Sequence, residues 1–285
     1  MKTKFFAFPG FSRVAMMLFA AVAFSLYSCQ PEGETQADED EEIATQEAEA
    51  EATYDDVEAY SFEALELTDF SVNRRTIAAA QRLIDSTCAT VTHDQINKTI
   101  TLDFGTGCTG PDGKVRAGII LITYTQRLYI PGAVVSISLD SFYVDGNHVE
   151  GSKTITNVSA NLASPISLNA VLTGGKVTWT DGTFATREYN RTSTWIRAAN
   201  PVNDQLEVEG VANGTRRNGN TYTATITSTL VFRRLCKIQG IRMPAEGTIL
   251  IQRSNRPDLT VDFGNGQCDT EITLSMNGQS QTVTL

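Results

Sequence analysis

The sequence predicts an all-β fold, either an antiparallel β-sandwich or a strongly curved, barrel-like sheet. From Cys88 onward Thr, Val and Ile dominate, and apolar and polar residues alternate with the period of two that is typical of half-buried strands. No long helical pattern separates these segments, so crossover helices and a parallel sheet are not expected. At about 8–12 residues per strand and turn, this region of roughly 200 residues predicts a dozen or more strands. Dipeptides that suit tight hairpins recur throughout, namely Asp112-Gly113, Asp145-Gly146, Gly174-Gly175, Asp181-Gly182, Asn213-Gly214, Asn218-Gly219 and Asn277-Gly278.

The clearest alternation runs from Thr221 to Phe232, where even-numbered positions are mostly apolar and odd-numbered positions are mostly threonine. We expect the apolar positions to share one buried face and the threonines to form a ladder on the other. Two-residue turns also predict strand registers. The predicted pairs are Ile272 with Val283 across Asn277-Gly278, and Trp179 with Phe184 across Asp181-Gly182.

The N-terminus has the pattern of a secretory leader. Three basic residues precede the apolar run Val14–Leu26, which is shorter than the roughly 20 residues that span a bilayer. Leu26-Tyr27-Ser28-Cys29 resembles the lipobox of bacterial lipoproteins. The resemblance implies that residues 1–28 are a signal peptide and that the acylated Cys29, the first mature residue, is the membrane anchor. The alternative is an ordinary cleaved signal beside a coincidental cysteine.

Residues 29–69 are expected to form a disordered acidic tether. Residues 30–69 contain 16 Asp or Glu and no Lys or Arg, and such like-charged blocks repel one another and stay solvated. The chain has 23 basic and 33 acidic residues, and residues 1–29 hold three of the basic ones, so residues 70–285 keep 20 basic and 17 acidic residues. The predicted body is therefore nearly neutral, and no nucleic-acid partner is expected.

Within the tether, Gln36-Ala37-Asp38-Glu39 resembles the acidic export signal of Bacteroidota lipoproteins. The resemblance implies display at the surface of the outer membrane. The alternative is a plain acidic spacer, which leaves the periplasmic face open as a location.

Residues 70–285 are expected to form one all-β domain that starts with a short helix, Ser71–Asp85. Asp103-Phe104-Gly105 and Asp262-Phe263-Gly264 predict one strand-ending turn used twice. Four cysteines remain, and an exported chain allows disulfides among them in three possible pairings. We favour Cys88 with Cys108 and Cys236 with Cys268, because each pair ties a strand to the end of one such turn.

Little in the sequence predicts chemistry. The two histidines, His93 and His148, fall in predicted turns without an evident nucleophile or metal-ligand partner. No nucleophile-elbow, phosphate-loop or zinc-protease motif is present, and the wide cysteine spacing does not favour a zinc site. We therefore predict a non-enzyme with no catalytic residue, metal or cofactor. A polysaccharide-active enzyme needs only two carboxylates and stays a minor alternative.

The segment from Trp179 to Arg197 combines both tryptophans with several arginines. Aromatic and arginine side chains together stack on sugars or anchor protein interfaces. The ligand-binding candidates are Trp179, Tyr189, Arg191 and Trp195, with core packing of the tryptophans as the alternative.

These observations predict a surface-displayed outer-membrane lipoprotein that acts as a non-catalytic binding, adhesion or envelope-structural module. Its partners would be the membrane, through Cys29, and a glycan or protein ligand. The alternative is a periplasm-facing lipoprotein whose curved sheet binds an apolar ligand. An apolar concavity between the sheet and the Ser71–Asp85 helix would favour that alternative.

Overall fold

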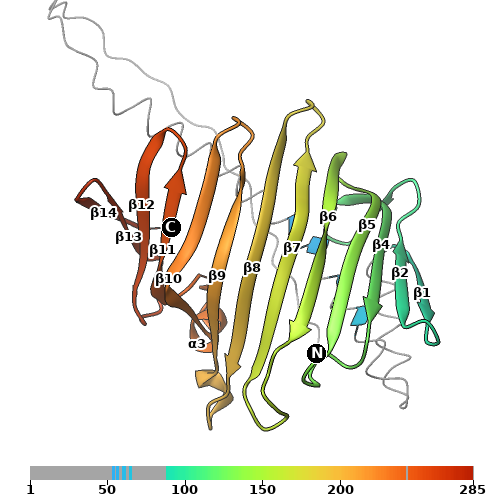
Figure 1. The fold of residues 1–285 in the computed structure, drawn as a ribbon, viewed down its shortest axis with the longest axis horizontal. Coiled ribbons are helices and arrows are strands. Elements are labelled where there is room, and N and C mark those ends of the chain that lie inside the picture. Colours follow the sequence, from blue (N-terminus) through green and yellow to red (C-terminus); the bar gives the residue numbers. More distant parts are fainter. Residues whose placement is uncertain are drawn as a thin grey trace, which may run out of the picture. The chain divides into compact units, whose positions relative to one another are not determined.

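The computed structural model describes residues 53, 54, 56, 57, 60, 61, 64, 65, 88–241 and 243–284. Fourteen strands form one antiparallel sheet in which spatial order follows chain order, except that β3 pairs with β4 beside that path (Figure 1). The strands are β1 (Thr90–Asp94), β2 (Thr99–Asp103), β3 (Cys108–Thr109), β4 (Val115–Tyr124), β5 (Val134–Val144), β6 (Asn147–Asn157), β7 (Ile166–Thr178), β8 (Phe184–Ile196), β9 (Gln205–Thr215), β10 (Thr221–Arg233), β11 (Glu246–Arg253), β12 (Arg256–Asn265), β13 (Glu271–Met276) and β14 (Gln279–Thr284). Between them lie a 3-10 turn, η1 (Pro201–Asn203), and a short helix, α3 (Arg234–Ile238).

The antiparallel all-β prediction is confirmed, and its two forms can now be distinguished. The described strands make a single sheet rather than the two sheets of a sandwich, and β1 and β14 are its open edges. Short connections explain this arrangement, because each strand turns back directly onto its predecessor and pairs with it. No connection within 88–241 or 243–284 carries the chain across to a second sheet.

The two predicted hairpin registers have different outcomes. Ile272 pairs with Val283, as expected for a two-residue turn at Asn277-Gly278. The predicted β7–β8 register is wrong by one residue, because Phe184 pairs with Thr178 rather than with Trp179. The turn is a three-residue loop, 180–182, which the backbone hydrogen bond from Trp179 to Thr183 closes. Its last residue, Gly182, has a φ of 84°.

Two of the expected turn dipeptides lie inside strands. Gly174-Gly175 falls where the β7 register shifts, so it forms a bulge rather than a turn. Asn213-Gly214 lies within β9, and a Cβ on Gly214 would sit 2.0 Å from the Thr186 carbonyl oxygen. Because Gly214 has no side chain, β8 and β9 can approach each other closely at this point.

One face of the sheet, which we call the apolar face, carries a continuous row of cross-strand partners. Antiparallel partners share a face, so the register defines this row across ten strands. Its members are Ile100, Ile122, Ile137, Lys153, Leu172, Tyr189, Ala212, Ala224, Ile251 and Leu259. From β2 to β7 these side chains are buried beneath helical residues of the segment 53–65.

The described residues of 53–65 were expected to belong to the tether, but they are helical and form part of the core. Tyr54, Val57, Ala64 and Leu65 are all buried against the sheet. Their spacing of three, seven and one places them on one helical face, which the acidic composition of the segment obscured. The expected Ser71–Asp85 helix, the leader, Cys29 and Gln36-Ala37-Asp38-Glu39 lie outside the described residues.

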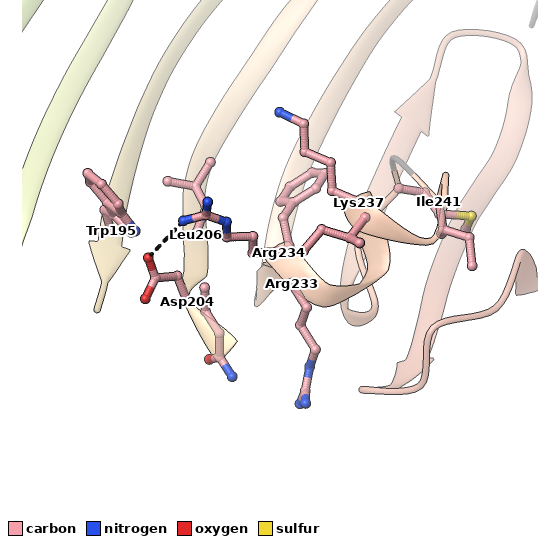
Figure 2. Close-up of a pocket in the computed structure, with 11 residues that line it drawn as sticks. Trp195, Asp204, Leu206, Arg233, Arg234, Lys237 and Ile241 are labelled. Carbon is pink, nitrogen blue, oxygen red and sulfur yellow. Dashed lines mark ion pairs between the residues drawn. The ribbon is translucent and has the colours of Figure 1, made fainter. Parts of the chain in front are cut away.

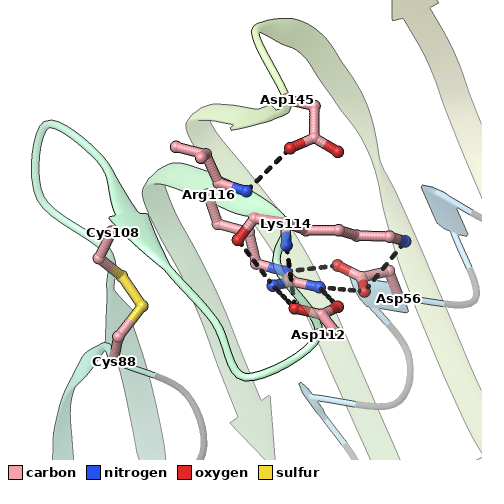
Figure 3. A network of polar contacts seen from close by, with 8 residues as sticks. Asp56, Cys88, Cys108, Asp112, Lys114, Arg116 and Asp145 are labelled. Carbon is pink, nitrogen blue, oxygen red and sulfur yellow. Dashed lines mark hydrogen bonds and ion pairs between the residues drawn. A yellow bond between two sulfur atoms is a disulfide. The ribbon is translucent and has the colours of Figure 1, made fainter. Parts of the chain in front are cut away.

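A buried ion-pair network fixes this segment to β4 (Figure 3). Arg116 is fully buried and donates from Nε to Asp56 Oδ2 at 2.7 Å and from Nη2 to Asp112 Oδ2 at 2.6 Å. Its guanidinium also stacks on the Tyr60 ring at 4.6 Å. Burial opposes the charge, but the hydrogen bonds to both carboxylates outweigh it and raise the pKa of Arg116 above its ordinary value. Lys114 adds a second cation 3.6 Å from Asp56.

The favoured disulfide pairing is confirmed, since Cys88 is bonded to Cys108 and Cys236 to Cys268. The repeated turn is also present. Asp103 and Asp262 each accept a hydrogen bond from the glycine two residues later at 2.8 Å, which is an Asx turn. The turn at Asp103 ends β2 as predicted, whereas β12 continues past Asp262 to Asn265.

Candidate functional site

From β8 to β14, the described helical residues that reach the apolar face are Tyr54, which lines one cavity, and those of α3, which lies at one end. We call this part of the apolar face the trough. Its floor is made of small residues on β9 and β10, namely Gly210, Ala212 and Ala224, and larger side chains of β8 and β11 stand on either side. A Cβ on Gly210 would lie 2.2 Å from the Asn190 carbonyl oxygen, so the floor is low there because the backbones are in contact. The result is a groove that runs along the strands.

Three adjoining cavities of 1090, 430 and 860 Å³ make up the trough. Arg191, Ala224 and Ile249 line both the first and the second cavity. Leu206 and Phe232 line both the second and the third. Ligand sites of about 300–1,000 Å³ are usual for small molecules, so the trough has room for an elongated one.

The hairpin end of the trough is basic. Arg187, Gly214, Tyr222 and Arg253 follow one another as cross-strand partners on β8, β9, β10 and β11. Arg216, the first residue after β9, lies with its guanidinium 5.3 Å from the Tyr222 ring centre. We call these three arginines and Arg191 the arginine row.

Specific contacts position the arginine row. Arg191 lies 5.1 Å from the centre of the Tyr189 ring, within the range of a cation–π contact. Arg253 donates from Nη2 to the Pro257 carbonyl oxygen at 2.9 Å. All four arginines line the 1090 Å³ cavity, and no described Asp or Glu lines it. This end of the trough therefore combines arginine side chains with an apolar floor.

The other end of the trough is closed by α3 (Figure 2). Trp195, Leu206 and Phe232 form the sheet side of the 860 Å³ cavity, and α3 contributes Lys237 and Ile238. The buried Cys236 ties α3 to Cys268 on the loop after β12. This disulfide sets the position of the helix over the end of β10.

Among the described residues that line the α3 cavity, Asp204 is the one carboxylate, and it already has partners. Asp204 accepts a hydrogen bond from the Ala198 backbone nitrogen at 2.9 Å. Its second oxygen lies 3.7 Å from Nη1 of Arg234, the ion pair drawn in Figure 2. These contacts give Asp204 a structural role in holding α3 against the β8–β9 connection.

The structure brings together three of the four predicted ligand-binding candidates. Tyr189, Arg191 and Trp195 alternate along β8 and all face the trough. Trp179 lies at the opposite end of the β7–β8 hairpin, where it packs against the core and the Arg217 guanidinium stacks on it at 4.4 Å. Arg216 and Arg253 were not predicted. They come from other hairpins, and only the sheet register places them beside Arg187.

The histidines lie in strands rather than in the expected turns, and neither lines the trough. His93 on β1 shares a hydrogen bond of 2.7 Å between its Nε2 and the Tyr124 hydroxyl, and burial lowers the pKa of His93. His148 on β6 stacks on Tyr143 with 4.7 Å between ring centres. Within the described residues no group of three or more His, Cys, Asp or Glu is placed to hold a metal ion.

No protein-family model, curated protein or solved structure matches this chain. The described part of the chain also holds no helix that is both long and apolar enough to cross a membrane.

Proposed function

We propose that this protein is an exported, lipid-anchored binding protein of the bacterial envelope that holds an apolar ligand in the trough. The observation that carries the proposal is the uneven covering of the apolar face. Helical residues of 53–65 bury it from β2 to β7, whereas aliphatic side chains such as Ile249, Ile251 and Leu274 are only half-buried beside open cavities. A contiguous apolar groove of this kind is characteristic of a ligand-binding surface.

The lining of the trough favours binding over catalysis. General acid–base chemistry needs a carboxylate, histidine or similar group within hydrogen-bond reach of the substrate. The described residues that line the 1090 and 430 Å³ cavities include no Asp, Glu or His. In the 860 Å³ cavity, Asp204 is held by Ala198 and Arg234.

The N-terminal sequence supports the proposed cellular location. The leader and the lipobox at Cys29 support a lipid anchor, and the two disulfides agree with an oxidising compartment. Gln36-Ala37-Asp38-Glu39 supports display outside the outer membrane. Protease treatment of intact cells tests this placement, since cleavage beside an intact periplasmic control indicates the surface. Protection until the outer membrane is permeabilised would instead support the periplasmic face.

A pair of variants on one strand tests the binding role. Ala224→Trp fills the trough floor, whereas Thr223→Trp places the same ring on the opposite face of β10. With the neutral fluorophore N-phenyl-1-naphthylamine as probe, we expect saturable binding to the unaltered protein and to Thr223→Trp. Ala224→Trp should weaken binding at least tenfold. Equal affinity for all three proteins would contradict the proposal.

Trp195 supports a second candidate, a glycan or protein ligand at the α3 end. The residue is 38% exposed, and the guanidinium of Arg197 lies 4.6 Å from the ring centre. Exposed aromatic side chains beside arginine are frequent anchors in interfaces. A glycan screen with unaltered protein and Trp195→Ala tests this candidate, which fails if the two give the same pattern.

A further inference from the structure

We propose that two copies of this chain associate through the outer edge of β14, so that their sheets join into one. Thr282 lies at the centre of the joint, opposite the same residue of the second copy. Such pairing does not depend on a ligand in the trough. It is supported by the composition of β14, by the backbone groups that face outward from it and by the register in which these groups match.

β14 is the open edge of the sheet that is best suited to pair with another chain (Figure 1). Among the residues that the structure describes, it pairs with β13 alone. Natural sheets protect open edges with charged side chains, proline or bulges, because the unpaired backbone groups there can accept a further strand. The six residues of β14 are uncharged, include no proline and pair with β13 without a register shift. β1, the other open edge, carries Asp94.

The turn at Asn277-Gly278 determines which backbone groups of β14 face outward. Both residues have positive φ, 51° and 77°, as a two-residue hairpin turn requires. The flanking residues, Met276 and Gln279, therefore exchange backbone hydrogen bonds, and such pairs alternate with non-bonded pairs along an antiparallel ladder. The N–H and C=O groups that point away from β13 belong to every second residue, namely Ser280, Thr282 and Thr284.

These outward-facing groups are self-complementary in one register. When Thr282 lies opposite the same residue of the second copy, Ser280 lies opposite Thr284 of that copy, and all three exchange backbone hydrogen bonds. A register shifted in either direction leaves one of the three without a partner. Antiparallel partners share a face, so hydroxyl side chains meet hydroxyl side chains on the face opposite the trough, and such pairs are favourable. No like charges meet within the joint.

The joint would place two troughs on one continuous surface. A two-fold axis through Thr282 and perpendicular to the sheet relates the two copies, so the apolar faces of both lie on the same side. Gln279, Gln281 and Val283 line the 1090 Å³ cavity. The two β14 strands would therefore form a shared wall between the two troughs.

Disulfide trapping in the full-length protein tests the register. In a hydrogen-bonded antiparallel pair the Cα atoms lie about 5.5 Å apart, within the range of a disulfide. We expect Thr282→Cys to form a covalent dimer on non-reducing gels, with the linked peptide identified by mass spectrometry. Ser280→Cys is the matched control on the same strand and face, because its counterpart lies about 14 Å away along the joint. It should give at least tenfold less dimer, and adding Thr284→Cys should restore it.

Charge exchange at the two-fold axis tests association without a covalent bond. A joint of one strand pair is small, and interfaces below about 1,200 Å² belong to weak, transient complexes. We therefore expect sedimentation to give a Kd between about 1 µM and about 1 mM. Thr282→Lys and Thr282→Glu each place like charges opposite one another and should weaken self-association at least tenfold. The side chain is exposed, so both variants should fold, and an equimolar mixture should recover the affinity of the unaltered protein.

Three results would overturn the proposal. The first is an unaltered protein that stays monomeric up to about 1 mM. The second is a Thr282→Cys variant that cross-links no more than Ser280→Cys. The third is self-association that neither charged variant weakens, since the copies would then meet through another surface.

Discussion

Replacing Arg116 by methionine should destabilise the protein by about 3–5 kcal/mol, the usual cost of leaving a buried charge without its partner. Asp56 would lose the guanidinium hydrogen bonds, and its side chain is only 10% exposed. Lys114, at 3.6 Å and partly exposed, is a weaker replacement. The contact with Tyr60 would be lost as well. The described helical residues of 53–65 should therefore detach from β4 before the strands separate.

The double variant Arg116→Met with Asp56→Leu separates the charge effect from the packing effect. With both charges removed, no uncompensated group stays buried, and well-packed apolar replacements of ion pairs are often close to neutral. We expect the double variant to recover at least half of the stability that Arg116→Met loses. Asp112 keeps its exposure of 43% and is solvated in both variants.

Urea unfolding at neutral pH measures these differences, with tryptophan fluorescence as the signal. Hydrogen exchange of the β4 and β5 amides reports whether segment 53–65 detaches first. A loss below about 1 kcal/mol in Arg116→Met, or a double variant that is less stable than the single one, would refute the reasoning. Either result would mean that the network contributes little to holding the segment on the sheet.

Three further predictions concern other parts of the chain. Hydrogen bonds from Arg116 lower the pKa of Asp112 from 3.8 to about 2, so its contribution is fully present above pH 3.8 and is lost as the pH falls through 2. Because Asp112 is partly exposed, its contribution to the free energy of unfolding is about 1 kcal/mol. Between pH 5 and pH 2, the free energy of unfolding should therefore change by about 1 kcal/mol less in Asp112→Asn than in the unaltered protein. Replacing Cys236 and Cys268 by alanine opens a 32-residue loop and should cost about 3 kcal/mol in urea unfolding, with the α3 amides losing the most protection. Cys29→Ser should abolish acylation and release the protein from the membrane fraction, as fractionation and mass spectrometry would show; unchanged membrane retention would contradict the lipobox assignment.

The faces of the strands were predictable because period-two alternation depends only on local sequence. The apolar even-numbered residues of β10 line the trough as expected, and the Asn277-Gly278 register is confirmed. The β7–β8 register was wrong because Asp181-Gly182 suits both two- and three-residue loops. Hydrogen bonds from Thr183 to Asp181 favour the longer loop, and such contacts are not visible in the dipeptide itself.

The core contribution of 53–65 was missed for a different reason. Its acidic composition indicated a solvated segment, yet a few apolar residues on one helical face suffice once a sheet is available to cover. The arginine row was predictable only in part. Arg191 and Tyr189 lie on one strand, where alternation indicates a shared face. Arg253 joins them through three further strand pairings, which depend on topology that local sequence does not encode.

The small residues of the trough floor are themselves an argument for a ligand. A sequence shaped by stability alone would fill the space above Ala224, which is half-buried, because each buried methylene group contributes about 0.8 kcal/mol. The β2–β7 half of the same face is filled in this way, by Ile100, Ile122 and Ile137 under a helix. Among the described residues, the half from β8 to β14 therefore forgoes stability that its own sheet shows to be attainable, as the proposed binding role would require. Ala224→Trp, which fills the floor, should accordingly leave the unliganded protein at least as stable to urea as the unaltered protein. The same variant should bind N-phenyl-1-naphthylamine more weakly.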